Sequence, residues 1–136
     1  MVDTRFPVSI HILTILARYQ PKLVSSEQLA VSVKTNASFI RKLVVALSAA
    51  GLVESVRGKS GGIRLAKSPK DIALDQIYSA VTDNCLMAVP DKMPNKTCAI
   101  SCGIGGILSE ISQEIEKNTL KHLAKRNLSE ILGRVK

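Results

Sequence analysis

The sequence contains no tryptophan, and its two tyrosines and two phenylalanines make up 3% of the 136 residues. Any hydrophobic core must therefore be aliphatic, because hydrophobic residues of all kinds reach 46%. This composition favours packed helices over a β-sandwich, whose strands are rich in aromatic and β-branched residues. The length accommodates one domain, or a small domain with an appendage.

The sequence also lacks long hydrophobic runs and a disulfide pattern. No segment approaches the roughly 20 apolar residues that a membrane helix needs. The apolar stretch near the N-terminus is interrupted by Ser9 and His11, which does not match a signal peptide. Three cysteines, an odd number, are not typical of a disulfide framework. We therefore expect a cytoplasmic protein without a membrane partner.

Acidic residues are scarce in the first half of the chain. Residues 1–66 contain nine Lys or Arg and three Asp or Glu, whereas residues 67–136 contain ten and eight. The formal net charge of +8 is thus concentrated toward the N-terminus. Concentrated positive charge favours a polyanionic partner, because each neutralised phosphate releases condensed counterions. A basic surface that only aids solubility is the alternative.

Apolar residues at helical spacing, together with capping residues, predict a mainly α protein. The expected helices span about 4–18, 26–33, 36–50, a segment starting at 68, 99–117 or beyond, and 128–135. Their expected N-caps include Thr4, Ser25 or Ser26, Asn36, and Asn127 or Ser129. Gly51 is well placed to end the third helix. Two short strands, Leu52–Val56 and Ile63–Leu65, flank a loop rich in glycine.

The second and third predicted helices are joined by a short turn at 34–36, as in a helix-turn-helix. In that geometry the second helix of the pair offers its N-terminal residues to base edges in the major groove of DNA. The candidate residues are Asn36, Ser38, Phe39, Arg41 and Lys42. Asparagine and arginine can bind adenine and guanine, respectively, through two hydrogen bonds. The alternative is a solvated basic helix in an ordinary α+β domain.

The two strands and their loop predict a wing beside this helix. Candidate contacts to phosphates or to the minor groove are Arg57, Lys59, Ser60 and Arg64. Residues 34–64 contain six basic residues and one acidic residue. Together these features favour DNA binding. A winged-helix protein-interaction adaptor without a sensing cofactor is the alternative function.

The wing loop also matches two enzyme motifs, and neither fits its context. Gly58–Gly62 has the pattern G-x-S-x-G, but a nucleophile elbow joins a strand to a helix, whereas this loop joins two strands. Gly58-Lys59-Ser60 resembles the end of a P-loop, but the position of its first glycine is occupied by Val53. We therefore predict that the protein is not an enzyme. The competing hypothesis is a hydrolase that uses Ser60 as its nucleophile.

The three cysteines are candidates for metal binding or redox chemistry. Cys98 and Cys102 are four residues apart and share one face of a helix, and Cys85 can supply a third ligand. Thiolates suit iron–sulfur clusters and zinc. Lys96 favours the thiolate of Cys98, which would make that thiol redox-sensitive. The alternatives are therefore inert thiols, a redox-sensing thiol, or a cluster or metal site, and no cofactor is certain.

A long helix with an apolar stripe follows the predicted DNA-binding module, which already closes its own core. The stripe residues proposed for dimerisation are Ile104, Ile107, Leu108, Ile111 and Ile115. The economical partner is the same helix of a second copy, and a two-fold dimer places two recognition helices about 34 Å apart. We therefore divide the chain into a winged helix-turn-helix domain (1–83), a loop (84–97), and dimerisation and C-terminal helices (98–136).

These motifs resemble the Rrf-two (Rrf2) family of bacterial transcription regulators, and most closely its YwnA-like members. The resemblance covers nearly the whole chain. It rests on Ser38–Leu43, Ala50–Val53, Val56–Gly58, Gly61–Ala66, Pro69–Ile72 and Ile77–Val81. The family includes the iron–sulfur cluster regulator, the nitric-oxide-sensing repressor and the cysteine-metabolism repressor.

The resemblance implies a homodimeric winged-helix protein, usually a repressor, bound to a palindromic operator. It implies that Ser38, Phe39, Arg41 and Lys42 face the major groove and that Arg57 lies in the wing. Some members hold an iron–sulfur cluster through three closely grouped cysteines in the region corresponding to 85–102. Here twelve residues separate Cys85 from Cys98, and three separate Cys98 from Cys102. Other members have no cluster and sense through thiols or a partner protein.

Overall fold

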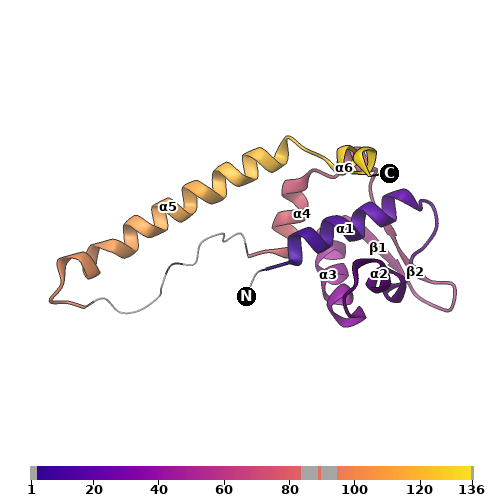
Figure 1. Cartoon of the computed structure of the whole chain (residues 1–136), viewed down its shortest axis with the longest axis horizontal. Helices are drawn as coiled ribbons and strands as arrows, with labels where there is room; N and C mark the ends of the chain where they lie inside the picture. Colours follow the sequence, from indigo (N-terminus) through magenta and orange to yellow (C-terminus); the bar gives the residue numbers. More distant parts are fainter. Residues whose placement is uncertain (1–2, 84–88, 90–94, 136) are drawn as a thin grey trace.

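Figure 1 shows a compact body from which one long helix projects. The computed structural model describes residues 3–83, 89 and 95–135. The fold is mainly α, as predicted: 64% of the described residues are helical, and they include one two-stranded sheet. The elements in chain order are α1 (Arg5–Arg18), α2 (Ser26–Val33), α3 (Ala37–Ala49), β1 (Val53–Val56), β2 (Gly62–Leu65), the 3₁₀ helix η1 (Pro69–Asp71), α4 (Leu74–Val81), α5 (Ala99–Ala124) and α6 (Leu128–Arg134).

Side chains cap three helices at predicted positions. The Ser25 hydroxyl accepts a hydrogen bond from the Gln28 backbone N–H, and the Gln28 side chain accepts one from the Ser25 N–H. Asn36 accepts from the Phe39 N–H at 2.7 Å and thereby fixes the start of α3. Asn127 accepts from the Glu130 N–H at the start of α6. These bonds satisfy N–H groups that a helix end otherwise leaves unpaired.

The predicted cap of α1 is different. Thr4 occupies the N-cap position, but its side chain makes no capping hydrogen bond, since its backbone is not extended there (ψ 5°). The carboxylate of Asp3 instead accepts hydrogen bonds from the Arg5 backbone N–H and guanidinium. The hydrogen bonds from Arg5 lower the pKa of Asp3 to about 2. Asp3 is therefore ionised at neutral pH and assists the start of α1.

The turn between α2 and α3 and the end of α3 rely on left-handed backbone. Lys34 ends α2 with φ 62°, and Gly51 follows α3 with φ 78°, as predicted for Gly51. The short 34–36 turn thus connects two helices that pack on each other, as in a helix-turn-helix.

The sheet is an antiparallel hairpin with one addition. Val53 pairs with Leu65 and Val56 with Gly62, so the connecting loop projects as a wing. Gly61 must be glycine, because a Cβ there would collide with the backbone carbonyl of Val56. The backbone N–H of Val24, between α1 and α2, donates to the Ile63 carbonyl, and the Val24 carbonyl accepts from the Ile63 N–H. This isolated bridge extends the sheet beyond the hairpin. The sequence did not indicate this pairing.

The helix predicted to start at 68 is interrupted, which corrects that expectation. Residues Pro69–Asp71 form a separate 3₁₀ helix, and α4 begins only at Leu74. Ile72 between them is extended, with its carbonyl accepting a hydrogen bond from the Leu128 N–H at 2.9 Å. Pairing with the C-terminal segment therefore takes the place of helix continuation.

The same pairing joins the C-terminal helix to the body. The Leu74 N–H donates to the Arg126 carbonyl, and Leu128 is completely buried in the core. Helix α6, which was expected to follow the dimerisation helix in one segment, packs on α1 and η1. The core is aliphatic, as composition predicted. Its fully buried large side chains are Ile12, Leu13, Leu16, Leu29, Ile40, Leu47, Leu52, Ile72, Ile77 and Leu128.

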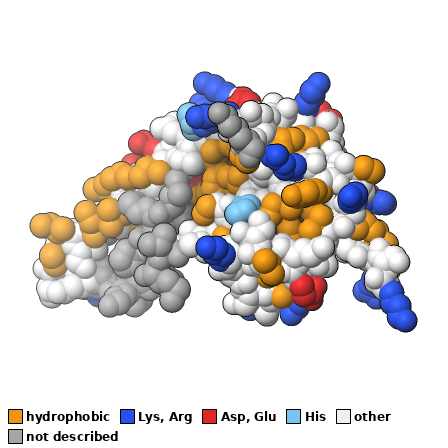
Figure 2. All heavy atoms as spheres, turned by 45° about the vertical axis from the view of Figure 1, so that its right-hand side comes forward, with side chains coloured by type: hydrophobic (Ala, Val, Ile, Leu, Met, Phe, Trp, Pro, Cys, Tyr) orange, Lys and Arg blue, Asp and Glu red, His pale blue; other side chains and the backbone are white. Residues whose placement is uncertain are grey.

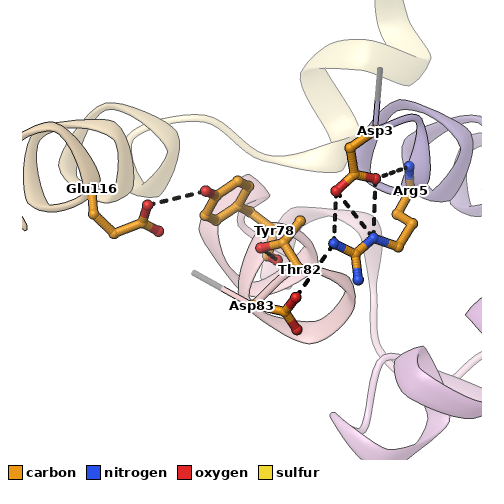
Figure 3. A network of polar contacts seen from close by, with 6 residues as sticks. All are labelled: Asp3, Arg5, Tyr78, Thr82, Asp83 and Glu116. Atoms are coloured by element: carbon orange, nitrogen blue, oxygen red, sulfur yellow. Dashed lines mark hydrogen bonds and ion pairs between the residues drawn. The ribbon is translucent and has the colours of Figure 1, made fainter. Parts of the chain in front are cut away.

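Helix α5 leaves the body beside α4, where Figure 3 shows a polar network. The Tyr78 hydroxyl donates to Glu116 of α5 at 3.2 Å, and Phe6 packs edge-on against the Tyr78 ring. Arg5 of α1 lies 3.7 Å from the carboxylate of Asp83. These contacts connect α1, α4 and the C-terminal half of α5.

Among the helices that the structure describes, none combines the length and the hydropathy of a membrane span.

We predict that Leu128→Ala lowers the free energy of unfolding by about 2–5 kcal/mol, since it opens a cavity in the core. Val135→Ala, a truncation of an exposed residue just after the same helix, is the control and should change stability by less than about 0.5 kcal/mol. Urea unfolding followed by circular dichroism measures both. Equal effects of the two changes would show that α6 does not contribute to the core.

Candidate nucleic-acid interface

Helix α3 presents one exposed stripe away from the body. Ile40, Leu43, Val44 and Leu47 are buried on its inner side. The exposed positions 38, 41, 42 and 45 recur at helical spacing and therefore lie on one face: Ser38, Arg41, Lys42 and Val45. Three of these four were candidates from sequence; Val45 was not. Burial of the aliphatic face thus turns the polar and cationic face outward.

Asn36 and Phe39, also predicted to contact bases, have structural roles at the same end of α3. The side-chain oxygen of Asn36 caps the helix, and Phe39 is half-buried against the core. Both lie next to the exposed stripe. Their contacts with DNA stay a prediction.

Arg41 has an acidic neighbour that sequence spacing did not indicate. Its guanidinium lies 3.7 Å from the carboxylate of Glu27, which belongs to the first turn of α2. Both side chains are more than half exposed, so the ion pair is weak. It places the Arg41 guanidinium beside the first turn of α2 while leaving the side chain free to reach another acceptor.

The wing carries its free cations at the loop. Arg57, Lys59 and Ser60 are exposed, and Gly58 adopts φ 109° at the turn. The Gly61 N–H closes this turn on the Gly58 carbonyl at 3.0 Å. Neither Arg57 nor Lys59 forms an ion pair with any described residue.

Arg64 differs from the other basic residues of the wing. It lies directly across the hairpin from Glu54, and the two side chains form an ion pair at 3.0 Å. The charge of Arg64 is therefore paired with that of Glu54 on the hairpin, whereas Arg57 and Lys59 lie at the loop. A cross-strand pair of this kind stabilises the hairpin by about 0.2–1 kcal/mol.

Arg18 and Lys22 are two further exposed cations that sequence reasoning missed. They lie on an open hollow together with Val24, the residue that bridges to β2, and Gln28 of α2. Figure 2 shows Lys and Arg side chains spread around a hydrophobic area on one face, with few acidic side chains in view. The pairing of Val24 with Ile63 and the packing of α1 on β2 bring this segment beside the wing, and local sequence does not reveal either contact.

Cys98 and Cys102 lie together at the start of α5. Cys98 is the N-cap: its sulfur accepts from the Ser101 N–H at 3.4 Å, and its carbonyl accepts from the Cys102 N–H. The Cys102 thiol donates to the carbonyl of Asn95 at 3.5 Å and is exposed. A role of these two thiols in metal binding or redox chemistry stays a prediction. Cys85 lies outside the described residues.

These thiols alone do not form a cluster site. An iron–sulfur cluster requires about four ligands, usually cysteines. Among residues 3–83, 89 and 95–135, no three His, Cys, Asp or Glu side chains come together in a group that could hold a metal ion. The described residues thus provide two neighbouring thiols and no completed metal site.

The apolar stripe of α5 is uncovered. No residue of this 26-residue helix is buried, and its isoleucines at 100, 104, 107, 111 and 115 are 39–74% exposed. Leu108 is half-buried. The projecting helix on the left of Figure 2 correspondingly shows a run of hydrophobic side chains. At about 1.5 Å per residue the helix is roughly 39 Å long, so this apolar surface extends well beyond the body.

A helix-turn-helix followed by a basic two-stranded wing defines a winged-helix DNA-binding protein. Comparison with known families agrees. The family model described as Rrf2, iron-dependent transcriptional regulator, matches residues 2–134. The chain belongs to the Rrf2 family. It is therefore a DNA-binding transcription regulator, and members of the family are not enzymes.

The individual relatives span almost the full chain. YwnA of Bacillus subtilis (strain 168), assigned as an HTH-type transcriptional regulator, is 29% identical over 133 residues, which are 98% of each chain. The HTH-type transcriptional regulator NsrR of Shouchella clausii (strain KSM-K16) is 32% identical over 85% of this chain and 82% of its own. A crystal structure of a transcriptional regulator from Lactobacillus plantarum has a TM-score of 0.81 at 20% identity, covering 96% of this chain and 88% of that one. The predicted family and fold are confirmed.

Proposed function

We propose that this protein is a homodimeric repressor that binds a palindromic operator and works in the cytoplasm, where it meets chromosomal DNA. We further propose that thiols at the start of α5 receive its signal. The observation that carries the DNA-binding part is the exposed stripe of α3, backed by a buried aliphatic face and flanked by the unpaired cations of the wing. This shape fits a helix in the major groove with a loop along the backbone.

Within the stripe, Arg41 is the candidate for base recognition. Arginine commonly donates two hydrogen bonds to guanine in the major groove. In the free protein Glu27 is its neighbour at 3.7 Å. Because this ion pair is weak and exposed, guanine can replace Glu27 at little cost. Ser38 and Lys42 lie on the same face, and Asn36 and Phe39 adjoin it.

The wing residues have a different role. Arg57, Lys59 and Ser60 project from the loop, where they neutralise or bind phosphates without reading sequence. Arg64 supports the ribbon through Glu54 and remains half exposed, so it can also approach the backbone. Arg18 and Lys22 add positive charge beside the root of the wing.

The uncovered stripe of α5 supports the homodimer. An apolar surface of this length on a helix without any buried residue requires a partner, and a second α5 offers the same stripe. A two-fold axis through such a helix pair presents two α3 helices to one face of DNA. Half-sites about one helical turn apart then form a palindrome.

The thiol input follows from the position of the cysteines. Cys98 caps α5 and Cys102 lies on its first turn, so chemistry at either sulfur acts on the start of the proposed dimer helix. Hydrogen peroxide can accept two electrons from a pair of thiols, which releases two waters and leaves a disulfide. A changed α5 start would alter how the two DNA-binding bodies are spaced and would release the operator.

We predict that Arg41→Ala weakens binding to an operator selected from random duplexes by about 1–3 kcal/mol and weakens binding to random DNA much less. Lys59→Ala should weaken both to a similar degree and reduce the dependence of affinity on salt. Lys117→Ala, an equal change of charge on α5, is the control. Fluorescence anisotropy at several salt concentrations measures the three variants.

If Arg41→Ala and Lys59→Ala each lose the same affinity for operator and for random DNA, the assigned roles are wrong. A protein without any salt-dependent DNA binding would instead favour the adaptor.

We predict that Ile111→Asp, in the middle of the stripe, converts the dimer to a monomer, because it introduces a charge into an apolar interface. Gln113→Asp, at an exposed position on the opposite face of the same helix, should leave the dimer intact. Sedimentation velocity gives the masses, and circular dichroism shows whether the helices persist. The same mass for both variants would contradict the α5 interface.

If the thiols act without a cluster, as proposed, anaerobically purified protein should be colourless and free of iron and sulfide. Hydrogen peroxide should then lower operator affinity at least fivefold, which corresponds to a coupling of about 1 kcal/mol. Cys98→Ser should abolish this response. Stoichiometric iron and sulfide with visible absorbance would replace the thiol proposal with a cluster, and an unchanged affinity after oxidation would show that the thiols are inert.

A further inference from the structure

Val45 is an exposed apolar residue at the C-terminal end of the exposed stripe of α3. It lies one helical turn after Arg41 on α3, and its side chain is 70% exposed. The other residues of the stripe, Ser38, Arg41 and Lys42, are polar or charged. A valine in this place has no function in a purely electrostatic interface.

Packing within the chain does not explain Val45. The hydrophobic core and the partly buried residues around it include its neighbours Val44 and Ala46 but not Val45. Helix α3 packs on α2, α4 and β1, while α5 packs on α4. Figure 1 shows α5 leading away from α3, so the apolar stripe of α5 lies away from α3.

The major groove contains one apolar group that could cover this side chain. Among the four bases only thymine carries a methyl group there, and apolar side chains recognise it by contact. Each buried methyl or methylene group contributes about 0.8 kcal/mol, which is roughly a fourfold change in affinity. The flanking Arg41 supplies hydrogen bonds that set the register.

We propose that Val45 contacts the 5-methyl group of a thymine and thereby contributes to operator specificity. Four helical residues rise about 6 Å, which is close to two base-pair steps of about 3.4 Å each. The thymine therefore lies about two base pairs from the base that Arg41 reads. The inference rests on the proposed binding of an operator through α3.

The test begins with an operator selected from random duplexes by the full-length protein. Each thymine is then replaced singly by uracil, which removes the methyl group and keeps the base pair. The wild-type protein should lose about threefold to tenfold in affinity at one thymine of each half-site. Val45→Ala should bind the thymine and uracil forms of that site equally.

Val31→Ala is the matched control, because Val31 is also an exposed valine, 78% accessible, but on α2. It should retain the full difference between thymine and uracil. Since both valines are exposed, neither change should lower the thermal unfolding temperature appreciably.

Two failures are distinguishable. If selection enriches no sequence, the proposed operator binding itself fails, and the Val45 contact fails with it. If an operator is found but no uracil substitution changes affinity, the Val45 proposal alone is overturned. It is equally overturned if Val45→Ala keeps the methyl effect or if Val31→Ala removes it.

Discussion

The structure depends on the burial of one aliphatic face of α3. Ile40, Leu43 and Leu47 insert into a core that contains almost no aromatic side chain. Because a helix has a fixed period, fixing these residues inward fixes the opposite face outward. The orientation of the exposed stripe is therefore a result of packing, and the side chains proposed to contact DNA need no restraint of their own. The weak contact between Arg41 and Glu27 is consistent with this division of roles.

The wing and helix α5 are attached to the same body in different ways. The hairpin is held at its root by the pairing of Val24 with Ile63, and its loop is shaped by Gly58 and Gly61. Its charges can approach DNA because the ribbon beneath them is anchored. Helix α5, in contrast, contacts α4, where Glu116 in its C-terminal half bonds to Tyr78, and it is followed by α6, whose Leu128 is buried in the core. Helix α5 can therefore form the proposed interface with a second copy without disturbing the DNA-binding body.

The proposed signal site is remote from the bases. Cys98 and Cys102 lie at the far end of α5, away from its contact with α4 (Figure 1). In the proposed dimer, an effect of these thiols on DNA would therefore pass through the spacing of the two DNA-binding bodies. Tyr78 and Glu116 lie at the joint between arm and body, and their hydrogen bond restrains the angle at which α5 leaves α4.

Local sequence by itself determined the helices, the aliphatic core and the basic helix-and-wing pattern. It also determined the start of α3 at Asn36 and its end before Gly51. These features depend on periodicity, capping and composition, all of which act over a few residues. Only the tertiary structure decided the extended break at Ile72, the bridge from Val24 to Ile63, the pairing of Glu27 with Arg41 and the burial of Leu128. Each of these joins segments that are distant in sequence or set at a steep angle. The free energy of such contacts arises only when the whole core assembles, so no local pattern records it.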